Sequence, residues 1–163
     1  MPMPKPDDRQ GAAAPSPDAL GWSCARTMLD RDRVSRSLGI ALVDAGAGRA
    51  TLEMTIRDDM LNGFGTCHGG VLFTLADMAL ACACNSGNER SVAHHCSIIY
   101  LRPGEVGERL IATAVERGKV GRVGIYDVSL KDSRGRIIGE FLGHARTIGG
   151  PVLDESAPRE IGA

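Results

Sequence analysis

Residues 62–86 read NGFGTCHGGVLFTLADMALACACNS, and this stretch decides how the rest of the chain must be arranged. Residues 71–86 are nearly all apolar or small, and the segment is long enough for about four helical turns. A helix that is apolar on almost every side has to be surrounded by other elements. One carboxylate, Asp77, interrupts the run. The stretch therefore predicts a buried central helix that carries a single acid.

Patterns typical of β-strands lie on both sides of this helix. Before it, apolar residues alternate in LGIALVDAGAGRATLEMTI (38–56), which predicts a strand–turn–strand hairpin. After it, residues 91–103 and 108–148 hold four β-prone runs, which are separated by the turns RPGEVG, RGKVG and DSRG. Strands that are joined by short turns pair antiparallel. We therefore expect an α+β fold, with an antiparallel sheet of about six strands wrapped around one long central helix.

Signals at the helix ends complete this outline. Loosely periodic apolar residues between 18 and 37 predict a short N-terminal helical segment, with Asp18 as its N-cap. Gly87 can serve as the left-handed C-cap of the central helix. Small residues on that helix would let strands approach closely, and they are Gly70, Ala76, Ala79, Ala81 and Ala83.

Length and composition indicate one globular domain at residues 19–152. Residues 1–18 hold almost no large apolar group and are predicted to form a mobile tail, and residues 153–163 a second one. The start lacks the pattern of a secretory signal, and the longest apolar run is too short to span a membrane. We therefore expect a cytoplasmic protein. A net charge of −1 gives no indication of binding to nucleic acid or to a membrane surface.

The five cysteines suggest a possible metal site, but their spacing argues against one. They are Cys24, Cys67, Cys82, Cys84 and Cys96. A zinc site is disfavoured because no C-x-x-C pair is present, and Cys82 and Cys84 would point about 200° apart around a helix. A nucleophilic Cys67–His68 pair is disfavoured because neighbouring side chains on extended chain point apart. We predict reduced thiols and no metal.

The sequence HGG at 68–70 stands directly before the predicted helix. Two glycines at a helix start leave backbone N–H groups unhindered at the positive end of the helix dipole, which suits a developing oxyanion. Asn62 and His68 add polar side chains in the same loop. Asp77 must then be either a structural acid, hydrogen-bonded to a neighbouring strand, or a functional acid that faces a cavity.

Helix geometry places the glycine N–H groups and the Asp77 carboxylate far apart in one chain. Gly69 and Asp77 are eight residues apart, which is about 12 Å along a helix axis. One ester or thioester carbon cannot touch both groups of one chain. If both belong to one site, that site combines Gly69 of one subunit with Asp77 of another. A two-fold dimer with antiparallel central helices would create two equal sites, so the site hypothesis predicts an obligate dimer.

The sequence strongly resembles the hotdog-fold acyl-CoA thioesterases of the PaaI (phenylacetic acid degradation) family, over about residues 25–150. The resemblance rests on the whole of 62–86, with its pattern H-G-G-x-x-x-x-L-A-D, and on two later segments, HCSIIYLRPGEVGERLIATA and GRVGIYDVSLKDSRGRIIGEFLGHARTIGG. It implies the hotdog fold and a homo-oligomer, built as a dimer of dimers.

The resemblance also implies roles for four residues. Asp77 would activate or orient the attacking water, or attack the thioester itself. The Gly69 N–H, together with Asn62, would polarise the thioester carbonyl, and His68 would lie near the sulfur or orient the loop. Some relatives have a hydroxyl residue near the start of the strand after the helix. At that place this chain has Ser91, Ala93, His94, His95 and Ser97, and we assign no fifth catalytic group.

The expected function is hydrolysis of acyl-CoA thioesters, with phenylacetyl-CoA or a hydroxylated aryl-acetyl-CoA as substrate and no cofactor. Two alternatives stay open: an enoyl-CoA hydratase or dehydratase on the same fold, and a non-catalytic acyl-CoA-binding protein. Arginine suits phosphate recognition, although exposed basic residues are commonly just solvated. The residues expected to contact coenzyme A are Gly70, Arg102, Lys119 and Arg122.

Overall fold

The computed structural model describes residues 14–154, so the outer parts of both expected tails, 1–13 and 155–163, lie outside the described residues. In chain order the elements are α1 (Pro17–Arg31), α2 (Arg33–Leu38), β1 (Ala41–Gly46), β2 (Arg49–Thr55), the 3-10 helix η1 (Asp58–Met60), α3 (Gly69–Cys84), β3 (Ser91–Tyr100), β4 (Arg109–Val120), β5 (Val123–Asp132) and β6 (Ile137–Thr147).

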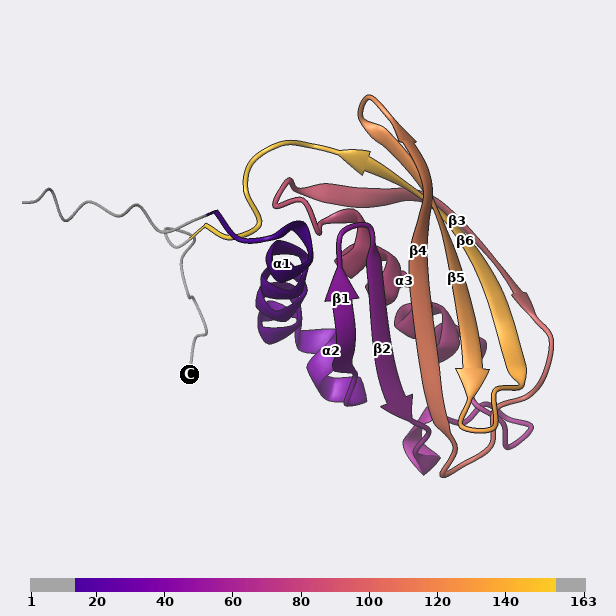
Figure 1. The fold of residues 1–163 in the computed structure, drawn as a ribbon. Helices are drawn as coiled ribbons and strands as arrows, with labels where there is room; N and C mark the ends of the chain where they lie inside the picture. The colour runs from indigo at the N-terminus through magenta and orange to yellow at the C-terminus, as the bar shows by residue number, and fades with distance from the viewer. Residues whose placement is uncertain (1–13, 155–163) are drawn as a thin grey trace, which may run out of the picture.

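Six strands form one antiparallel sheet in the order β1-β2-β4-β5-β6-β3. The sheet curls around α3, while α1 and α2 lie beside β1 at one edge (Figure 1). The strand β3 forms the other edge of the sheet. The predicted α+β fold, with its central helix and short N-terminal helical segment, is confirmed.

The helix α3 forms the centre of the hydrophobic core. Its fully buried side chains include Leu75, Ala76, Ala79 and Leu80. Side chains from the inner face of the sheet pack around them, among them Leu52, Met54, Leu110, Ala112, Val128, Leu130 and Ile138. Burying one large aliphatic side chain contributes about 1.5–3 kcal/mol, so this cluster dominates the stability of the fold.

One stripe of α3 is left uncovered by the sheet. It consists of Gly70, Thr74, Asp77 and Ala81, which lie on one face of the helix at successive spacings of four, three and four residues. Gly70 is exposed, and the other three are half-buried. We call these four residues the open stripe. Of the small residues that we expected strands to approach closely, Gly70 is exposed and Ala81 is half-buried, whereas Ala76, Ala79 and Ala83 are buried.

The helix caps differ from the prediction at both positions. Ser16, not Asp18, is the N-cap of α1, because its hydroxyl accepts the Ala19 N–H at 3.2 Å. Asp18 instead accepts the Ala47 N–H at 2.9 Å and pairs with Arg49, which ties α1 to the β1–β2 turn.

At its other end, α3 stops at Asn85, whose side chain replaces the glycine cap that we predicted at Gly87. The Asn85 amide donates to the Ala81 carbonyl at 2.9 Å and accepts from the Ser91 N–H at 2.8 Å. The left-handed residue of this turn is Asn88, with φ 59°.

The connection between β3 and β4 is not the hairpin turn that the sequence suggested. β3 pairs with β6, whereas β4 pairs with β2 and β5. Residues 101–108 therefore cross the end of the curled sheet, along the bottom of the view in Figure 1. The Cys67 N–H donates to the Gly104 carbonyl at 2.9 Å, which holds this crossing segment against the loop before α3.

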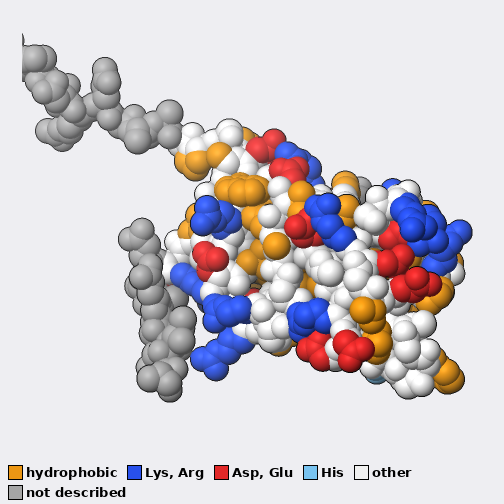
Figure 2. Space-filling view, turned by 90° about the horizontal axis from the view of Figure 1, so that it is seen from below, with side chains coloured by type: hydrophobic (Ala, Val, Ile, Leu, Met, Phe, Trp, Pro, Cys, Tyr) orange, Lys and Arg blue, Asp and Glu red, His pale blue; other side chains and the backbone are white. Residues whose placement is uncertain are grey.

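The surface carries charges of both signs. On the face shown in Figure 2, lysine and arginine side chains lie next to aspartate and glutamate side chains. Ion pairs within the described residues include Arg57–Asp59 at 2.9 Å and Arg136–Glu108 at 3.0 Å. None of the helices in residues 14–154 combines the length and the hydropathy that crossing a lipid bilayer requires.

Candidate active site

The loop before α3 is held in one shape by the side chain of Asn62. Its Oδ1 accepts from the Phe64 N–H at 2.9 Å and from the Thr66 N–H at 3.3 Å, and its Nδ2 donates to the Thr66 hydroxyl at 3.0 Å. These partners fix the orientation of the amide. One hydrogen of Nδ2 remains available for a ligand, since an NH₂ group carries two.

His68 is the N-cap of α3. Its Nδ1 accepts the Gly70 N–H at 2.9 Å, so the proton of the neutral imidazole lies on Nε2. The residue is exposed. This contact holds the imidazole ring against the start of the helix. It also means that the Gly70 N–H is already used within the protein.

The Gly69 N–H is the unoccupied donor at this helix start. Gly69 is the first residue of α3, so its N–H has no acceptor inside the helix, and no acceptor for it is found elsewhere in residues 14–154. A free N–H at the positive end of a helix is suited to bind an anionic oxygen. The structure therefore leaves this N–H available to a ligand.

Tyr100, at the end of β3, completes this end of the site and was missed in the sequence analysis. Its hydroxyl donates to the Gly69 carbonyl at 2.9 Å. A Cβ atom on residue 69 would lie 3.1 Å from Tyr100 Cζ and from its hydroxyl oxygen, so the ring packs directly over the glycine. Partial burial raises the pKa of the Tyr100 phenol, which keeps it a hydrogen-bond donor at neutral pH.

These groups surround a hollow of about 340 Å³. Its lining consists of Asn62, Thr66, Cys67, Gly69, Leu72, Tyr100, Leu101, Arg102 and Pro103. The structure thus brings together three residues that the sequence predicted for the site, namely Asn62, Gly69 and Arg102. The crossing segment 101–108 supplies one wall, which explains why the expected hairpin would not have produced this hollow.

Asp77 lies on the open stripe and does not line that hollow. Its nearest hydrogen-bonding group in the described residues is the Cys96 thiol, 4.0 Å from Oδ1, which is a weak contact. Burial raises the pKa of the Asp77 carboxyl, and the negative charge of Asp32 raises it further. A half-buried carboxylate without a strong partner fits a functional acid better than a structural one.

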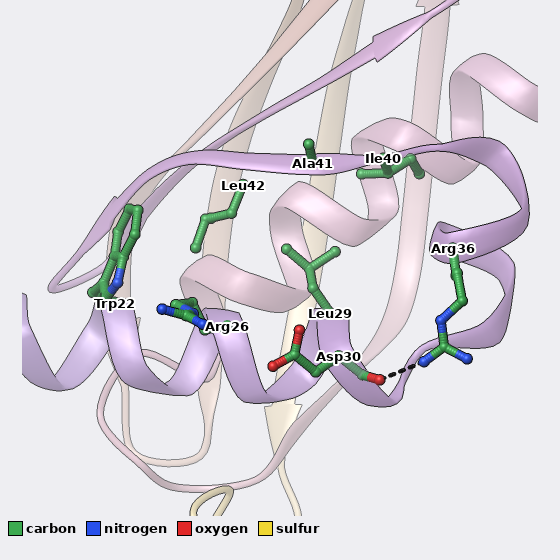
Figure 3. Close-up of a pocket in the computed structure, with 8 residues that line it drawn as sticks. All are labelled: Trp22, Arg26, Leu29, Asp30, Arg36, Ile40, Ala41 and Leu42. Atoms are coloured by element: carbon green, nitrogen blue, oxygen red, sulfur yellow. Dashed lines mark hydrogen bonds between the residues drawn. The ribbon is translucent and has the colours of Figure 1, made fainter. Parts of the chain in front are cut away.

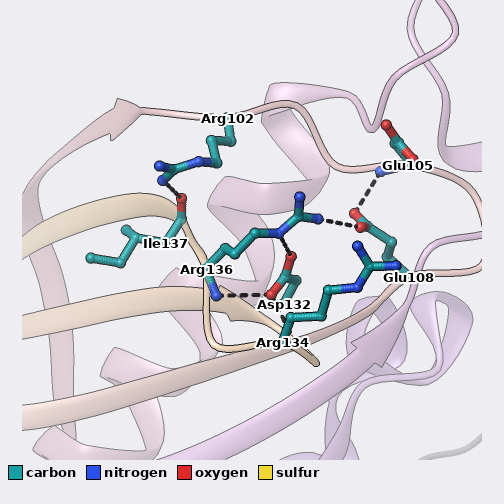
Figure 4. A network of polar contacts seen from close by, with 7 residues as sticks. All are labelled: Arg102, Glu105, Glu108, Asp132, Arg134, Arg136 and Ile137. Carbon is teal, nitrogen blue, oxygen red and sulfur yellow. Dashed lines mark hydrogen bonds and ion pairs between the residues drawn. The ribbon is translucent and has the colours of Figure 1, made fainter.

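The basic residues expected to contact coenzyme A lie at opposite ends of the molecule. Arg102 is held near the start of α3 by its hydrogen bond to the Ile137 carbonyl, 2.8 Å long (Figure 4). Lys119 and Arg122 flank the β4–β5 turn at the other end of the sheet, and Lys119 lies 3.8 Å from Glu89. Within one chain, they therefore cannot share one phosphate group with Arg102.

A network of charges beside Arg102 fixes the β5–β6 turn (Figure 4). Asp132 is buried and accepts hydrogen bonds from the backbone N–H groups of Arg134 and Arg136, each 2.9 Å long. The Arg136 guanidinium pairs with both Asp132 and Glu108. Arg136 is thereby neutralised, whereas Arg102 forms no ion pair within residues 14–154.

The thiols do not form a second centre in the described residues. All five cysteines are free, and no group of three or more His, Cys, Asp or Glu side chains in residues 14–154 could hold a metal ion. The Cys67 thiol points toward the His68 carbonyl rather than its ring, and burial raises the pKa of Cys67 to about 11. Cys67 is therefore a neutral thiol at physiological pH.

A larger hollow of about 380 Å³ lies between α1, α2 and β1 (Figure 3). Trp22 and Arg26 project into it from α1, and Leu42 from β1 (Figure 3). None of the residues that we predicted for the site lines it. It lacks both the helix start and Asp77, so its size alone does not mark it as the reaction site.

Comparisons with known proteins find relatives of this chain. Residues 64–138 match the family described as the thioesterase superfamily. The chain is 39% identical over 135 residues to the acyl-coenzyme A thioesterase PaaI of Escherichia coli K12, which covers 83% of this chain and 96% of the relative. It is 30% identical over 120 residues to human acyl-coenzyme A thioesterase 13, covering 71% of this chain and 85% of the relative.

Solved structures show the same fold. The E. coli PaaI protein from the phenylacetic acid degradation operon superposes with a TM-score of 0.82 at 39% identity, covering 83% of this chain and 99% of that chain. A point mutant of the phenylacetic acid degradation protein PaaI from Thermus thermophilus gives a TM-score of 0.69 at 33% identity, covering 72% of this chain and 100% of that chain.

The raised pKa of Asp77 leads to a prediction about stability. Its folded pKa lies above the ordinary value of 3.8, so the folded protein binds more protons than the unfolded chain between the two pKa values. The ionised carboxylate therefore destabilises the fold once the pH exceeds this window. We expect Asp77→Asn to be more stable than the wild type near pH 7, with the difference shrinking toward about pH 3.

Urea unfolding of both proteins at one protomer concentration, at each pH, measures this difference. Equal stability at both pH values would show that Asp77 is not desolvated in the fold.

Proposed function

We propose, since this chain belongs to the thioesterase superfamily, that it hydrolyses acyl-coenzyme A thioesters to a free acid and coenzyme A. The observation that supports this most strongly is the free Gly69 N–H at the start of α3, above a hollow whose wall carries Arg102. A thioester carbonyl at this N–H would have its developing negative charge stabilised in the transition state.

The base for this reaction is Asp77 of the partner subunit. A carboxylate without a strong hydrogen-bond partner can accept a proton from water, and the hydroxide equivalent then attacks the thioester carbon. The tetrahedral intermediate carries its oxyanion at the Gly69 N–H. Its collapse breaks the carbon–sulfur bond, and the proton held by Asp77 passes to the departing sulfur. We assign the Nε2–H of His68 to a hydrogen bond with that sulfur, since Nδ1 is occupied by the Gly70 N–H.

Two features of the fold support a site shared between two chains. Gly69 and Asp77 of one chain are about 12 Å apart along α3, which is too far for one carbonyl. The strand β3 is an edge of the sheet and exposes the apolar side chains of Val92 and Ile99. A second copy, related by a two-fold axis, would cover this edge and the open stripe, and would set its Asp77 opposite Gly69.

The same two-fold symmetry would bring basic residues that are far apart in one chain close together in the dimer. With antiparallel central helices, the end of one chain that carries Arg102 lies at the end of the partner that carries Lys119 and Arg122. We place the coenzyme A phosphates there. The acyl group then lies toward Asp77, and the comparison with the E. coli protein from the phenylacetic acid degradation operon favours an aryl-acetyl group.

Two further proposals concern the assembly of the protein and its location. We propose that two such dimers associate as a dimer of dimers, and that the protein acts in the cytoplasm. The five unpaired cysteines fit a reducing compartment.

Replacing the proposed base tests the reaction directly. Asp77→Asn should lower kcat for acyl-CoA hydrolysis by at least about 100-fold, because a neutral amide cannot accept the proton of water. The folded state should be retained. Release of free thiol from a panel of aryl-acetyl and alkyl CoA thioesters measures the effect.

Unchanged thiol release in this variant would rule out Asp77 as the base. Hydration of enoyl-CoA by the wild type, without thiol release, would instead favour the hydratase alternative. Binding of acyl-CoA with no turnover at all would favour a non-catalytic binding protein.

The coenzyme A contact can be tested with two substrates. Arg102→Ala should raise KM for a CoA thioester by about 5- to 20-fold, as expected for one charge-assisted phosphate contact. It should leave KM unchanged for the matching N-acetylcysteamine thioester, which has no phosphates. Arg26→Ala, in the larger hollow, is the control and should change neither value. An equal rise in KM for both substrates would place Arg102 at the acyl group instead.

A further inference from the structure

Tyr100, Gly69, Gly70 and His68 are connected by two hydrogen bonds through one peptide group. The Tyr100 hydroxyl donates to the Gly69 carbonyl at 2.9 Å. The N–H of that same peptide group belongs to Gly70, and it donates to His68 Nδ1 at 2.9 Å. These hydrogen bonds therefore link the phenol of Tyr100 on β3, through the first peptide group of α3, to the imidazole of His68 before the helix.

Hydrogen bonds on the two ends of one amide strengthen each other. A donor on the carbonyl oxygen draws electron density from the nitrogen, and the N–H becomes a better donor. The Gly70 N–H therefore holds His68 Nδ1 more firmly as an acceptor when the Tyr100 hydroxyl is in place. With Nδ1 occupied, the proton of the neutral imidazole is confined to Nε2.

We propose that Tyr100 is a positioning residue for the thioesterase reaction, acting through the Gly69–Gly70 peptide to fix the tautomer and orientation of His68. This inference rests on the proposed function in one respect, the use of His68 at the departing sulfur. Tyr100 itself need not touch the reacting atoms. It also packs over Gly69, so it restrains the residue whose N–H receives the oxyanion.

A simpler role for Tyr100 would be to anchor β3 to the start of α3. In that case loss of the hydroxyl would lower stability but would not change the state of His68. The two roles therefore differ in a property that can be observed without any substrate. That property is the tautomer of one imidazole.

The chain offers a matched control, because Tyr100 and Tyr126 are its two tyrosines. The Tyr126 hydroxyl donates to Glu116 Oε2 at 2.8 Å, between neighbouring strands of the sheet. Tyr126→Phe removes a phenol hydrogen bond of similar length that has no contact with the α3 start. A general effect of losing such a bond would appear in both variants.

The experiment compares Tyr100→Phe and Tyr126→Phe with the wild type. Long-range ¹H–¹⁵N spectra of the imidazoles should show His68 as the Nε2–H tautomer in the wild type and in Tyr126→Phe, and as a mixture in Tyr100→Phe. For CoA thioesters, Tyr100→Phe should lower kcat by about fivefold with KM within about twofold of the wild type. In a His68→Asn background, adding Tyr100→Phe should lower kcat no further.

An unchanged His68 tautomer in Tyr100→Phe would overturn the inference, and so would a further loss of kcat in the His68→Asn background. If the wild type releases no thiol from any CoA thioester, the proposed function fails. The tautomer measurement still decides the role of Tyr100 in that case.

Discussion

The rise of the α-helix is the constraint on which this account depends. The donor at Gly69 and the acid at Asp77 belong to one rigid helix, and eight residues separate them by about 12 Å. No rotation of a side chain closes that distance, because the N–H at Gly69 belongs to the backbone. If both groups act on one carbonyl, a second chain must supply one of them. Catalysis then requires that two chains assemble.

The curled sheet makes this arrangement compatible with a stable fold. It buries most of α3, including Leu75 and Leu80, and leaves Asp77 half-buried on the open stripe. The carboxylate is desolvated enough to raise its pKa, yet it is not enclosed by strands. The end of β3 and the crossing of residues 101–108 add the second element of the site, because they bring Tyr100 and Arg102 to the start of the helix. The part of the site that each chain supplies therefore depends on the order of the strands as well as on the glycines before α3.

The sequence predicted the features that depend on local periodicity. The run around Asp77 predicted a buried helix, and alternating residues predicted six strands, because solvent exposure repeats every 3.6 or 2 residues. It did not predict that β3 pairs with β6, since pairing between distant strands leaves no local pattern. Tyr100 was missed for the same reason: its partner, Gly69, is 31 residues away. The cap at Asn85 was missed because glycine after a helix is a common C-cap signal, which pointed to Gly87. The hydrogen bonds that stabilise Asn85 as the cap reach across the turn to Ser91.

Mixing two inactive variants tests the shared site most directly. Asp77→Asn removes the base, and Gly69→Pro removes the N–H at the first position of α3. The first helical position accepts proline, and His68 already has the extended backbone that precedes proline. The exposed Tyr100 ring must shift slightly to admit the proline Cβ. Each homodimer should be inactive. After subunit exchange of an equal mixture, half of the dimers are mixed and each has one intact site, so about a quarter of the wild-type thiol release should return. No recovery, with mixed dimers demonstrated by mass spectrometry, would contradict a site built from two chains.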